Sequence, residues 1–108
     1  MRTKEEQMEI AKTIAQQIGG NMFKMMTGAE FMILNERNMD GLMIKFKGSR
    51  KANTLKILLN WTDTYDLEFG RVGKEYKVVE KMEGIYFDEL QDVFERVTGL
   101  YTSLHRRT

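Results

Sequence analysis

The sequence predicts one α+β domain, residues 1–108, in which an N-terminal helix and a C-terminal helix pack on one face of an antiparallel meander sheet of four to five strands. Apolar residues recur at helical spacing near both ends of the chain, and they alternate with polar residues at period two in the middle. The loops between the alternating segments are too short for the crossover that parallel strands require. At 108 residues the chain has the size of a single domain.

The first predicted element is a helix over residues 4–18. Thr3 followed three residues later by Glu6 is a capping box, which is a helix-start signal. Apolar side chains then recur on one helix face: Met8, Ala11, Ile14, Ala15 and Ile18. Gly19 can adopt the left-handed conformation that ends a helix, and a short second helical segment follows as far as Gly28.

Five short segments in the middle of the chain have the composition and period of strands. They span residues 31–34, 42–47, 54–61, 65–69 and 76–79. The polar residues 35–41 predict a turn between the first two. Alternation places one set of side chains on the sheet face that the helices cover: Leu42, Ile44, Phe46, Leu55, Ile57, Leu59, Trp61, Leu67 and Phe69, with Tyr65 on the same buried phase.

The last third of the chain returns to the helical period. Asp88 and Gln91 have the spacing of a cap residue and its reciprocal partner. The apolar residues of one face follow: Leu90, Val93, Phe94 and Val97. Gly99 is placed to end this helix. Residues 103–108 have no apolar pattern, and we expect them to fray.

Composition excludes several kinds of catalytic and metal site. The chain has no cysteine and a single histidine, His105, so disulfides, thiolate chemistry, Cys-based metal centres and His-pair metal sites are excluded. The glycines around Arg71 fit neither a dinucleotide fingerprint nor a phosphate loop. We therefore expect no cofactor, no metal and no enzymatic activity. A minor enzyme that uses Asp63, Asp66 and Glu68 for acid–base or metal chemistry is kept as a third hypothesis, behind the two binding functions given below.

The sequence also predicts no membrane partner and a cytoplasmic location. No stretch approaches the roughly 18 apolar residues of a membrane helix. The charged N-terminus is not followed by the apolar region of a secretory signal.

The clearest asymmetry along the chain is electrostatic. The formal net charge is only +1, but residues 45–58 carry five bases and no acid, whereas residues 59–95 carry ten acids against four bases. The five bases are Lys45, Lys47, Arg50, Lys51 and Lys56. Alternation places Lys45, Lys47 and Lys56 on the sheet face opposite the apolar residues, with Arg50 and Lys51 in the connecting loop. These bases predict a basic hairpin that can bind phosphates or an acidic protein surface. The more usual alternative is a solvated sheet face whose lysines are matched across strands by Asp66 and Glu68.

Methionine is the second unusual feature, with nine in the chain. Methionine fills irregular cores and also forms adaptable binding surfaces. Core filling is the more usual alternative, and we expect it for most of the nine. Met39, in the predicted turn, and Met43, on the face of the lysines, are the candidates for a protein interface or a homodimer contact.

Four segments of the chain form a recognisable set: Ile18-Gly19-Gly20-Asn21, Met26-Thr27-Gly28-Ala29, Tyr65-Asp66-Leu67-Glu68-Phe69-Gly70 and the run of residues 86–102. On these segments the chain resembles a group of small proteins encoded by bacteriophages and prophages. The resemblance covers roughly residues 10–104 and rests on glycine stops, hairpin alternation and a capped helix. It implies a protein of a mobile element that acts inside a bacterial host cell, and it carries over no active site.

Two functions from different classes follow from these observations. The first is a non-enzymatic, phage-type interaction protein that binds a protein partner stoichiometrically, for example to modulate or inhibit a host or defence factor. The alternative is a weak nucleic-acid-binding protein that uses the basic hairpin of residues 45–58.

Overall fold

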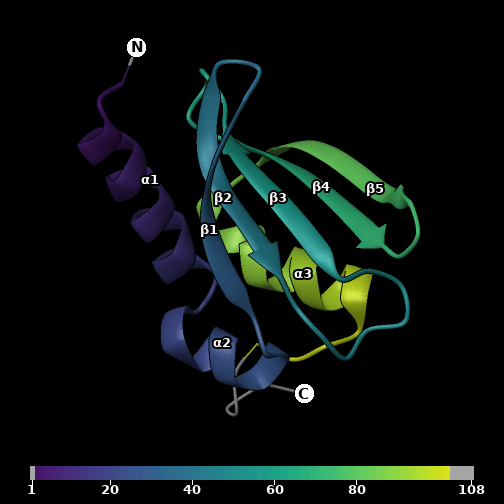
Figure 1. Cartoon of the computed structure of the whole chain (residues 1–108). Helices are drawn as coiled ribbons and strands as arrows, with labels where there is room; N and C mark the ends of the chain where they lie inside the picture. Colours follow the sequence, from purple (N-terminus) through teal and green to yellow (C-terminus); the bar gives the residue numbers. More distant parts are fainter. Residues whose placement is uncertain (1, 103–108) are drawn as a thin grey trace.

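The computed structural model of the chain describes residues 2–102 and confirms the predicted α+β layout (Figure 1). In chain order the elements are α1 (Lys4–Gln17), α2 (Gly20–Thr27), β1 (Glu30–Glu36), β2 (Met39–Lys45), β3 (Thr54–Leu59), β4 (Tyr65–Val72), β5 (Tyr76–Ile85), the 3-10 turn η1 (Phe87–Glu89) and α3 (Leu90–Thr98). Each strand pairs antiparallel with the next, in the order β1-β2-β3-β4-β5. The sheet is therefore a meander with β1 and β5 at its edges.

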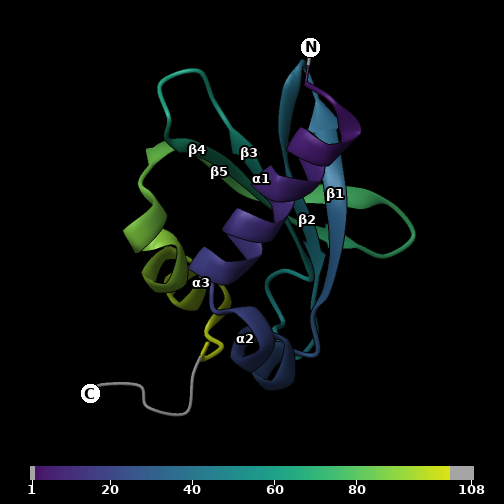
Figure 2. The ribbon, with the colours of Figure 1, turned by 90° about the vertical axis from the view of Figure 1, so that its left-hand side faces the viewer.

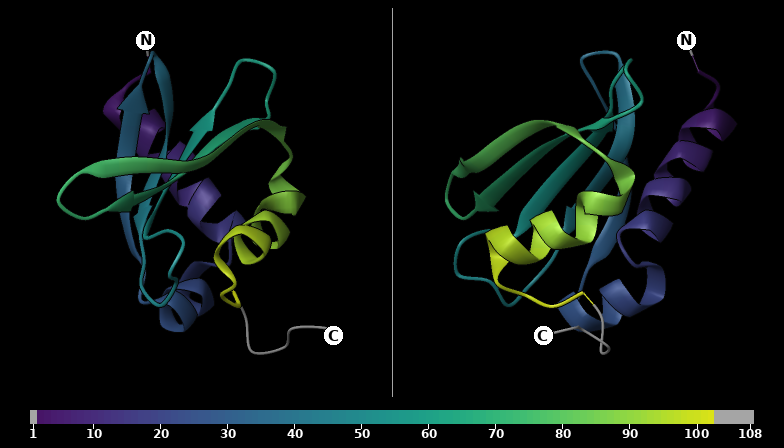
Figure 3. Two further views of the ribbon diagram at one scale, coloured as in Figure 1. Left: turned by 90° about the vertical axis from the view of Figure 1, so that its right-hand side faces the viewer. Right: turned by 180° about the vertical axis from the view of Figure 1, so that it is seen from behind.

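The helices pack on one side of the strongly twisted sheet, which we call the helix face (Figures 2 and 3). Helix α1 crosses β1 and β2, while α3 lies under the other half of the sheet. Side chains from the three helices and from the helix face form one core, which includes Ile14, Phe23, Ile44, Ile57 and Phe94. The opposite side of the sheet, which we call the open face, carries Met43, Lys56 and Glu68.

Phe94 of α3 lies at the centre of this core and is fully buried. Its ring meets Phe23 of α2 at a centroid distance of 4.8 Å and Phe46 at 4.9 Å, both edge to face. Phe69 of β4 is 6.4 Å away. Such aromatic pairs stabilise a core beyond the area that they bury. The predicted packing of the C-terminal helix against the sheet is confirmed.

The turn between β1 and β2 is shorter than predicted. Only Arg37 and Asn38 lie between the strands, instead of residues 35–41. Both have left-handed φ angles, 51° and 62°, which a two-residue hairpin turn of the favoured type requires. The polar residues around them are paired strand residues, and Met39 is the first residue of β2.

The prediction that Trp61 belongs to the core is wrong. Strand β3 ends at Leu59, and Trp61 lies in the following loop with 93% of its surface exposed. The Asn60 Oδ1 atom accepts backbone hydrogen bonds from Thr62 (2.9 Å) and Thr64 (3.3 Å). This Asx-type turn ends the strand alternation before it reaches Trp61. The other aromatic residues on the predicted phase are buried: Phe46, Tyr65 and Phe69.

The C-terminal helix begins differently from the prediction, because the predicted cap pair of Asp88 and Gln91 is replaced by other contacts. The Glu89 carboxylate accepts the backbone N–H of Tyr86 at 2.8 Å, and η1 precedes α3. Gln91 instead donates through Nε2 to the carbonyl oxygen of Ile18 at 3.2 Å. That hydrogen bond joins the start of α3 to the end of α1.

The predictions for residues 103–108, including His105, lie outside the described residues. Among residues 2–102, no helix has both the length and the apolar character that a membrane span needs.

Candidate polyanion-binding surface

Four of the five predicted basic residues lie at one end of the sheet, where β2 leads into β3. Lys45 is the last residue of β2, and the loop of residues 46–53 carries Lys47, Arg50 and Lys51. All four residues are exposed. Strand β2 ends before Lys47, so this lysine belongs to the loop rather than to the strand face predicted for it.

The β2–β3 loop is anchored to the body of the protein. Phe46 and Ala52, near its two ends, are buried in the core. Between them, the Ser49 hydroxyl donates to the carbonyl oxygen of Thr98 at the end of α3, at 2.8 Å. The loop backbone is therefore tied down while the cationic side chains remain in solvent.

The hairpin formed by β4 and β5 lies beside this loop. The side chain of Asn53 joins the two, because Nδ2 donates to the Val72 carbonyl oxygen (3.0 Å) and Oδ1 accepts the Val72 N–H (2.8 Å). Arg71 of β4 also donates through Nη1 to the Ser49 carbonyl oxygen at 3.1 Å. Near its turn the hairpin carries three exposed bases: Arg71, Lys74 and Lys77.

Seven bases thus gather at this end of the sheet. We call them the basic end: Lys45, Lys47, Arg50, Lys51, Arg71, Lys74 and Lys77. Charge counting along the chain missed the last three, because they fall within the acidic stretch of residues 59–95. Pairing the two strands of this hairpin in the sequence could have identified these three bases, because the turn brings Arg71 opposite Lys77.

The charges of the basic end have few acidic neighbours in the part of the chain that the structure describes. Arg71 directly faces Lys77 across the β4–β5 pair, and like charges so placed are destabilising. Two acids lie nearby, Glu75 in the hairpin turn and Glu30 opposite Lys45. Within residues 2–102, none of the seven bases forms an ion pair. Binding of an anion would relieve the repulsion between Arg71 and Lys77.

Lys56, the fifth predicted base, is not part of the basic end. Its Nζ atom lies 2.8 Å from the Glu36 carboxylate and 3.9 Å from that of Glu68, and only 20% of its side chain is exposed. The same atom lies 5.4 Å from the ring centre of Tyr76. The alternative interpretation, in which acids on the neighbouring strand neutralise the lysines of the sheet face, therefore holds for Lys56 and Glu68. Asp66 instead accepts a hydrogen bond from Asn60.

Tyr76 and Glu68 continue this polar network on the open face. The Tyr76 hydroxyl donates to Glu68 Oε2 at 2.6 Å, and Lys81 Nζ lies 3.8 Å from Glu68 Oε1. Burial, and secondarily the hydrogen bond to Glu68, raises the pKa of Tyr76 to about 12. Alternating acids and bases across four strands stabilise the open face of the sheet.

The acids near the β3–β4 loop do not converge on a common point that could hold a cation. Asp63 occupies a left-handed turn position with φ of 63°. Asp66 is engaged by Asn60, and Glu68 by Tyr76. Among residues 2–102 there is no group of three or more His, Cys, Asp or Glu side chains able to hold a metal ion.

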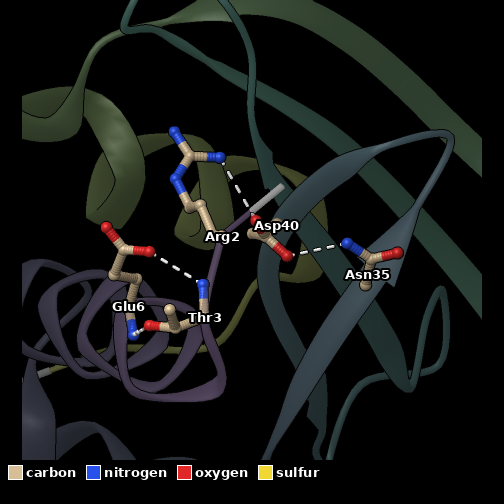
Figure 4. Close-up of polar contacts among 5 residues, drawn as sticks. All are labelled: Arg2, Thr3, Glu6, Asn35 and Asp40. Atoms are coloured by element: carbon tan, nitrogen blue, oxygen red, sulfur yellow. Dashed lines mark hydrogen bonds and ion pairs between the residues drawn. The ribbon is translucent and has the colours of Figure 1, made fainter.

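A second polar cluster lies at the opposite end of β1 and β2 (Figure 4). The Asp40 carboxylate is almost completely buried; it accepts from Arg2 Nη1 at 3.2 Å and from Asn35 Nδ2 at 2.7 Å. Beside it, the capping box of α1 is formed as predicted: Thr3 N–H donates to Glu6 Oε1 (2.7 Å) and Glu6 N–H to Thr3 Oγ1 (3.1 Å). The hydrogen bonds satisfy the Asp40 carboxylate, so we assign this cluster to tethering the N-terminal segment to the sheet.

The candidate interface methionines, Met39 and Met43, both belong to β2. Both residues are half-buried. Met43 faces Met32 of β1 on one side and Lys56 of β3 on the other.

The fold and the charged surface establish one class of protein, an α+β domain with a cationic end. Comparisons with protein-family models, with curated proteins and with solved structures gave no match. Function is therefore argued from the surface itself.

Proposed function

We propose that this chain is a non-enzymatic binding protein that holds a nucleic acid against the basic end. The supporting observation is that two loops, joined by Asn53 and Val72, bring seven exposed bases together without ion-pair partners in the described chain. Lysine and arginine that contact phosphates release condensed counterions, and this release drives sequence-independent binding.

The ring of Tyr76, next to Lys77 in β5, favours phosphate contacts over base stacking. Proteins specialised for single strands present aromatic rings on which bases stack. Tyr76 is engaged by Glu68 through its hydroxyl and by the Lys56 ammonium over its ring. We therefore expect weak binding to duplexes, without strong preference for sequence or for single strands.

An acidic protein surface is the second candidate partner, as in the interaction-protein hypothesis. The observation that favours it is the exposure of apolar side chains on the same hairpin, Val72 and Val78. Protein interfaces combine an apolar centre with a charged rim, whereas phosphate contacts need no apolar centre.

Fluorescence anisotropy of a labelled duplex, titrated with protein at several salt concentrations, tests the nucleic-acid proposal. With up to seven phosphate contacts, the logarithm of the binding constant should fall with the logarithm of salt concentration at a slope no steeper than about −6, from about −0.9 per contact. The double variant Arg50→Gln with Lys51→Gln should weaken binding and reduce the slope by about 2.

Two further double variants sharpen the test. Lys74→Gln with Lys77→Gln should weaken binding by a similar factor, because the fold places these hairpin lysines beside the loop. Lys4→Gln with Lys12→Gln removes the same charge from exposed positions of α1 and should leave affinity nearly unchanged. Absence of binding at low salt, or an equal loss of affinity in the α1 variant, would refute the nucleic-acid proposal.

The variant Val72→Ser distinguishes a protein partner from a nucleic acid. It should weaken binding to a protein surface that uses an apolar contact, and it should leave duplex binding intact.

A further inference from the structure

The two edges of the sheet are built differently. The β5 edge carries Lys77 and Lys81, and its pairing with β4 is interrupted by two register shifts. The β1 edge carries four consecutive apolar residues, Phe31-Met32-Ile33-Leu34, and pairs with β2 without interruption at all seven positions. Lysines and bulges are devices that prevent strand addition, and long regular apolar edges favour it. β5 has both devices, whereas the charges of β1, Glu30 and Glu36, lie at its two ends and leave the apolar run between them unprotected.

The free side of β1 has backbone groups that can pair with another strand. The two-residue turn makes Glu36 and Met39 a hydrogen-bonded pair, and such pairs alternate along an antiparallel ladder. The amide and carbonyl groups of Phe31, Ile33 and Asn35 are therefore directed away from β2. They form a row of three that is available to an added strand.

Apolar side chains line the same edge on both faces of the sheet. On the helix face, Ile33 is 46% exposed beside a groove of about 190 Å³ between α1 and β1, where Met8 of α1 is 41% exposed. On the open face, Met32 is partly exposed. Figure 2 shows that α1 crosses the strands without covering the outer side of β1.

We propose that a second copy of this chain docks here, with the two β1 strands antiparallel and the two-fold axis at Met32. In this register Met32 faces its own counterpart, Phe31 faces Ile33 of the other copy, and Glu30 faces Leu34. The four apolar residues of each copy are then covered, and no like charges are opposed. A symmetric interface of this kind is self-complementary.

Charge favours this register over the one in which the two-fold axis is shifted by one residue, to Ile33. An axis at Ile33 would set Glu30 of each copy against Glu36 of the other, an unfavourable like-charge pair. The axis at Met32 instead brings Glu36 of one copy opposite Gly28 of the other. The side chain of Lys47 lies beside Gly28, so this register adds a charge-complementary contact at each end of the pair.

The apolar groove supports the same arrangement. Phe31 and Ile33 of the second copy would lie on the helix face next to the groove, which is also lined by Ala11 and Ala15 of α1. When these two side chains dock, they would cover Met8 and Ile33 of the first copy and remove them from water. Burial of apolar surface is the main driving force for association. The dimer does not depend on the proposed nucleic-acid binding, because none of the four apolar edge residues belongs to the basic end. The two surfaces meet at their margin, where Glu30 faces Lys45 and Gly28 lies beside Lys47.

Sedimentation equilibrium of the full chain over a range of concentrations tests the proposal. The unmodified protein should be a dimer, and Ile33→Lys should be a monomer with an unchanged far-ultraviolet circular dichroism spectrum. The matched control Val79→Lys places the same change on the exposed β5 edge and should remain dimeric. An unmodified protein that is monomeric at 0.1 mM, or a folded Ile33→Lys variant that still dimerises, would overturn the proposal.

A cysteine pair tests the register, since the chain has no cysteine of its own. Met32→Cys places two thiols opposite each other at a non-hydrogen-bonded position, where the strands are close enough for a disulfide. Mild oxidation should cross-link this variant, whereas Leu34→Cys, whose thiol would face Glu30, should stay uncross-linked. Cross-linking of Leu34→Cys alone would show that the axis does not lie at Met32.

Discussion

The side chain of Asn53 and the backbone of Val72 form a reciprocal pair of hydrogen bonds, 3.0 Å and 2.8 Å long, between the β2–β3 loop and the β4–β5 hairpin. The two residues are 19 positions apart, and their contact unites the two halves of the basic end.

The first prediction concerns this contact. Asn53→Ala removes both hydrogen bonds, and since each contributes about 1 kcal/mol net, the free energy of unfolding should fall by about 1–2 kcal/mol. Duplex affinity should also fall although no charge is removed, because the loop and the hairpin lose their side-chain link at Asn53 and keep only the Arg71–Ser49 hydrogen bond and the backbone bond from residue 53 to Gly70. Urea denaturation and anisotropy measure the two effects. Asn21→Ala, at an exposed position of α2, is the control, and equal affinity in both variants would contradict this role of Asn53.

The second prediction concerns the core around Phe94. Phe94→Ala should lower the free energy of unfolding by ~3–5 kcal/mol, because it leaves a cavity among Phe23, Phe46 and Phe69. Phe87→Ala, in η1, removes an exposed ring and should change stability by less than about 1 kcal/mol. Chemical denaturation of the pair measures the difference. Similar values for the two variants would be incompatible with the described packing of α3.

The third prediction concerns Trp61, the single tryptophan of the chain. Since its ring is exposed, the fluorescence of the folded protein should resemble that of the unfolded chain and be readily quenched by acrylamide. Trp61→Ala should change stability by no more than about 0.5 kcal/mol, the usual range for surface substitutions. A blue-shifted, protected emission would show instead that the ring is buried.

The fourth prediction concerns alkaline pH. The pKa of Tyr76 is raised from 10.0 to about 12, chiefly by burial and next by the hydrogen bond to Glu68. The neutral phenol is favoured in the folded state, so its contribution to stability is complete below pH 10 and is lost as the pH rises toward 12. Tyr76→Phe should remove this part of the alkaline loss of stability.

Denaturation midpoints between pH 9 and 12 measure that effect. Burial also raises the pKa of Tyr65, so a smaller alkaline loss should remain in the Tyr76→Phe variant. Tyr86→Phe, which changes an exposed phenol, serves as the control. If the unmodified protein and Tyr76→Phe lose stability in parallel, the Tyr76–Glu68 contact does not control this range.

Local patterns were sufficient to predict the elements of the fold. The capping box of Thr3 and Glu6 starts α1 as predicted, and Gly99 ends α3 in the left-handed conformation with φ of 78°. Helical spacing around Phe94 and alternation around Ile57 identified core residues. These signals act over a few residues, because a cap or a repeat of burial is a property of one element. Where a local turn intervened, as at Asn60 before Trp61, simple alternation failed.

The order and type of the elements, the lack of cysteine and the concentration of bases in residues 45–58 therefore follow from the linear sequence. Which charges lie close enough to interact depends on the folded chain. The fold paired Lys56 with Glu36 and Glu68, and it brought Arg71, Lys74 and Lys77 to the β2–β3 loop. The physical reason is that electrostatic interaction depends on distance in space, and strand pairing sets distances between residues that are far apart along the chain.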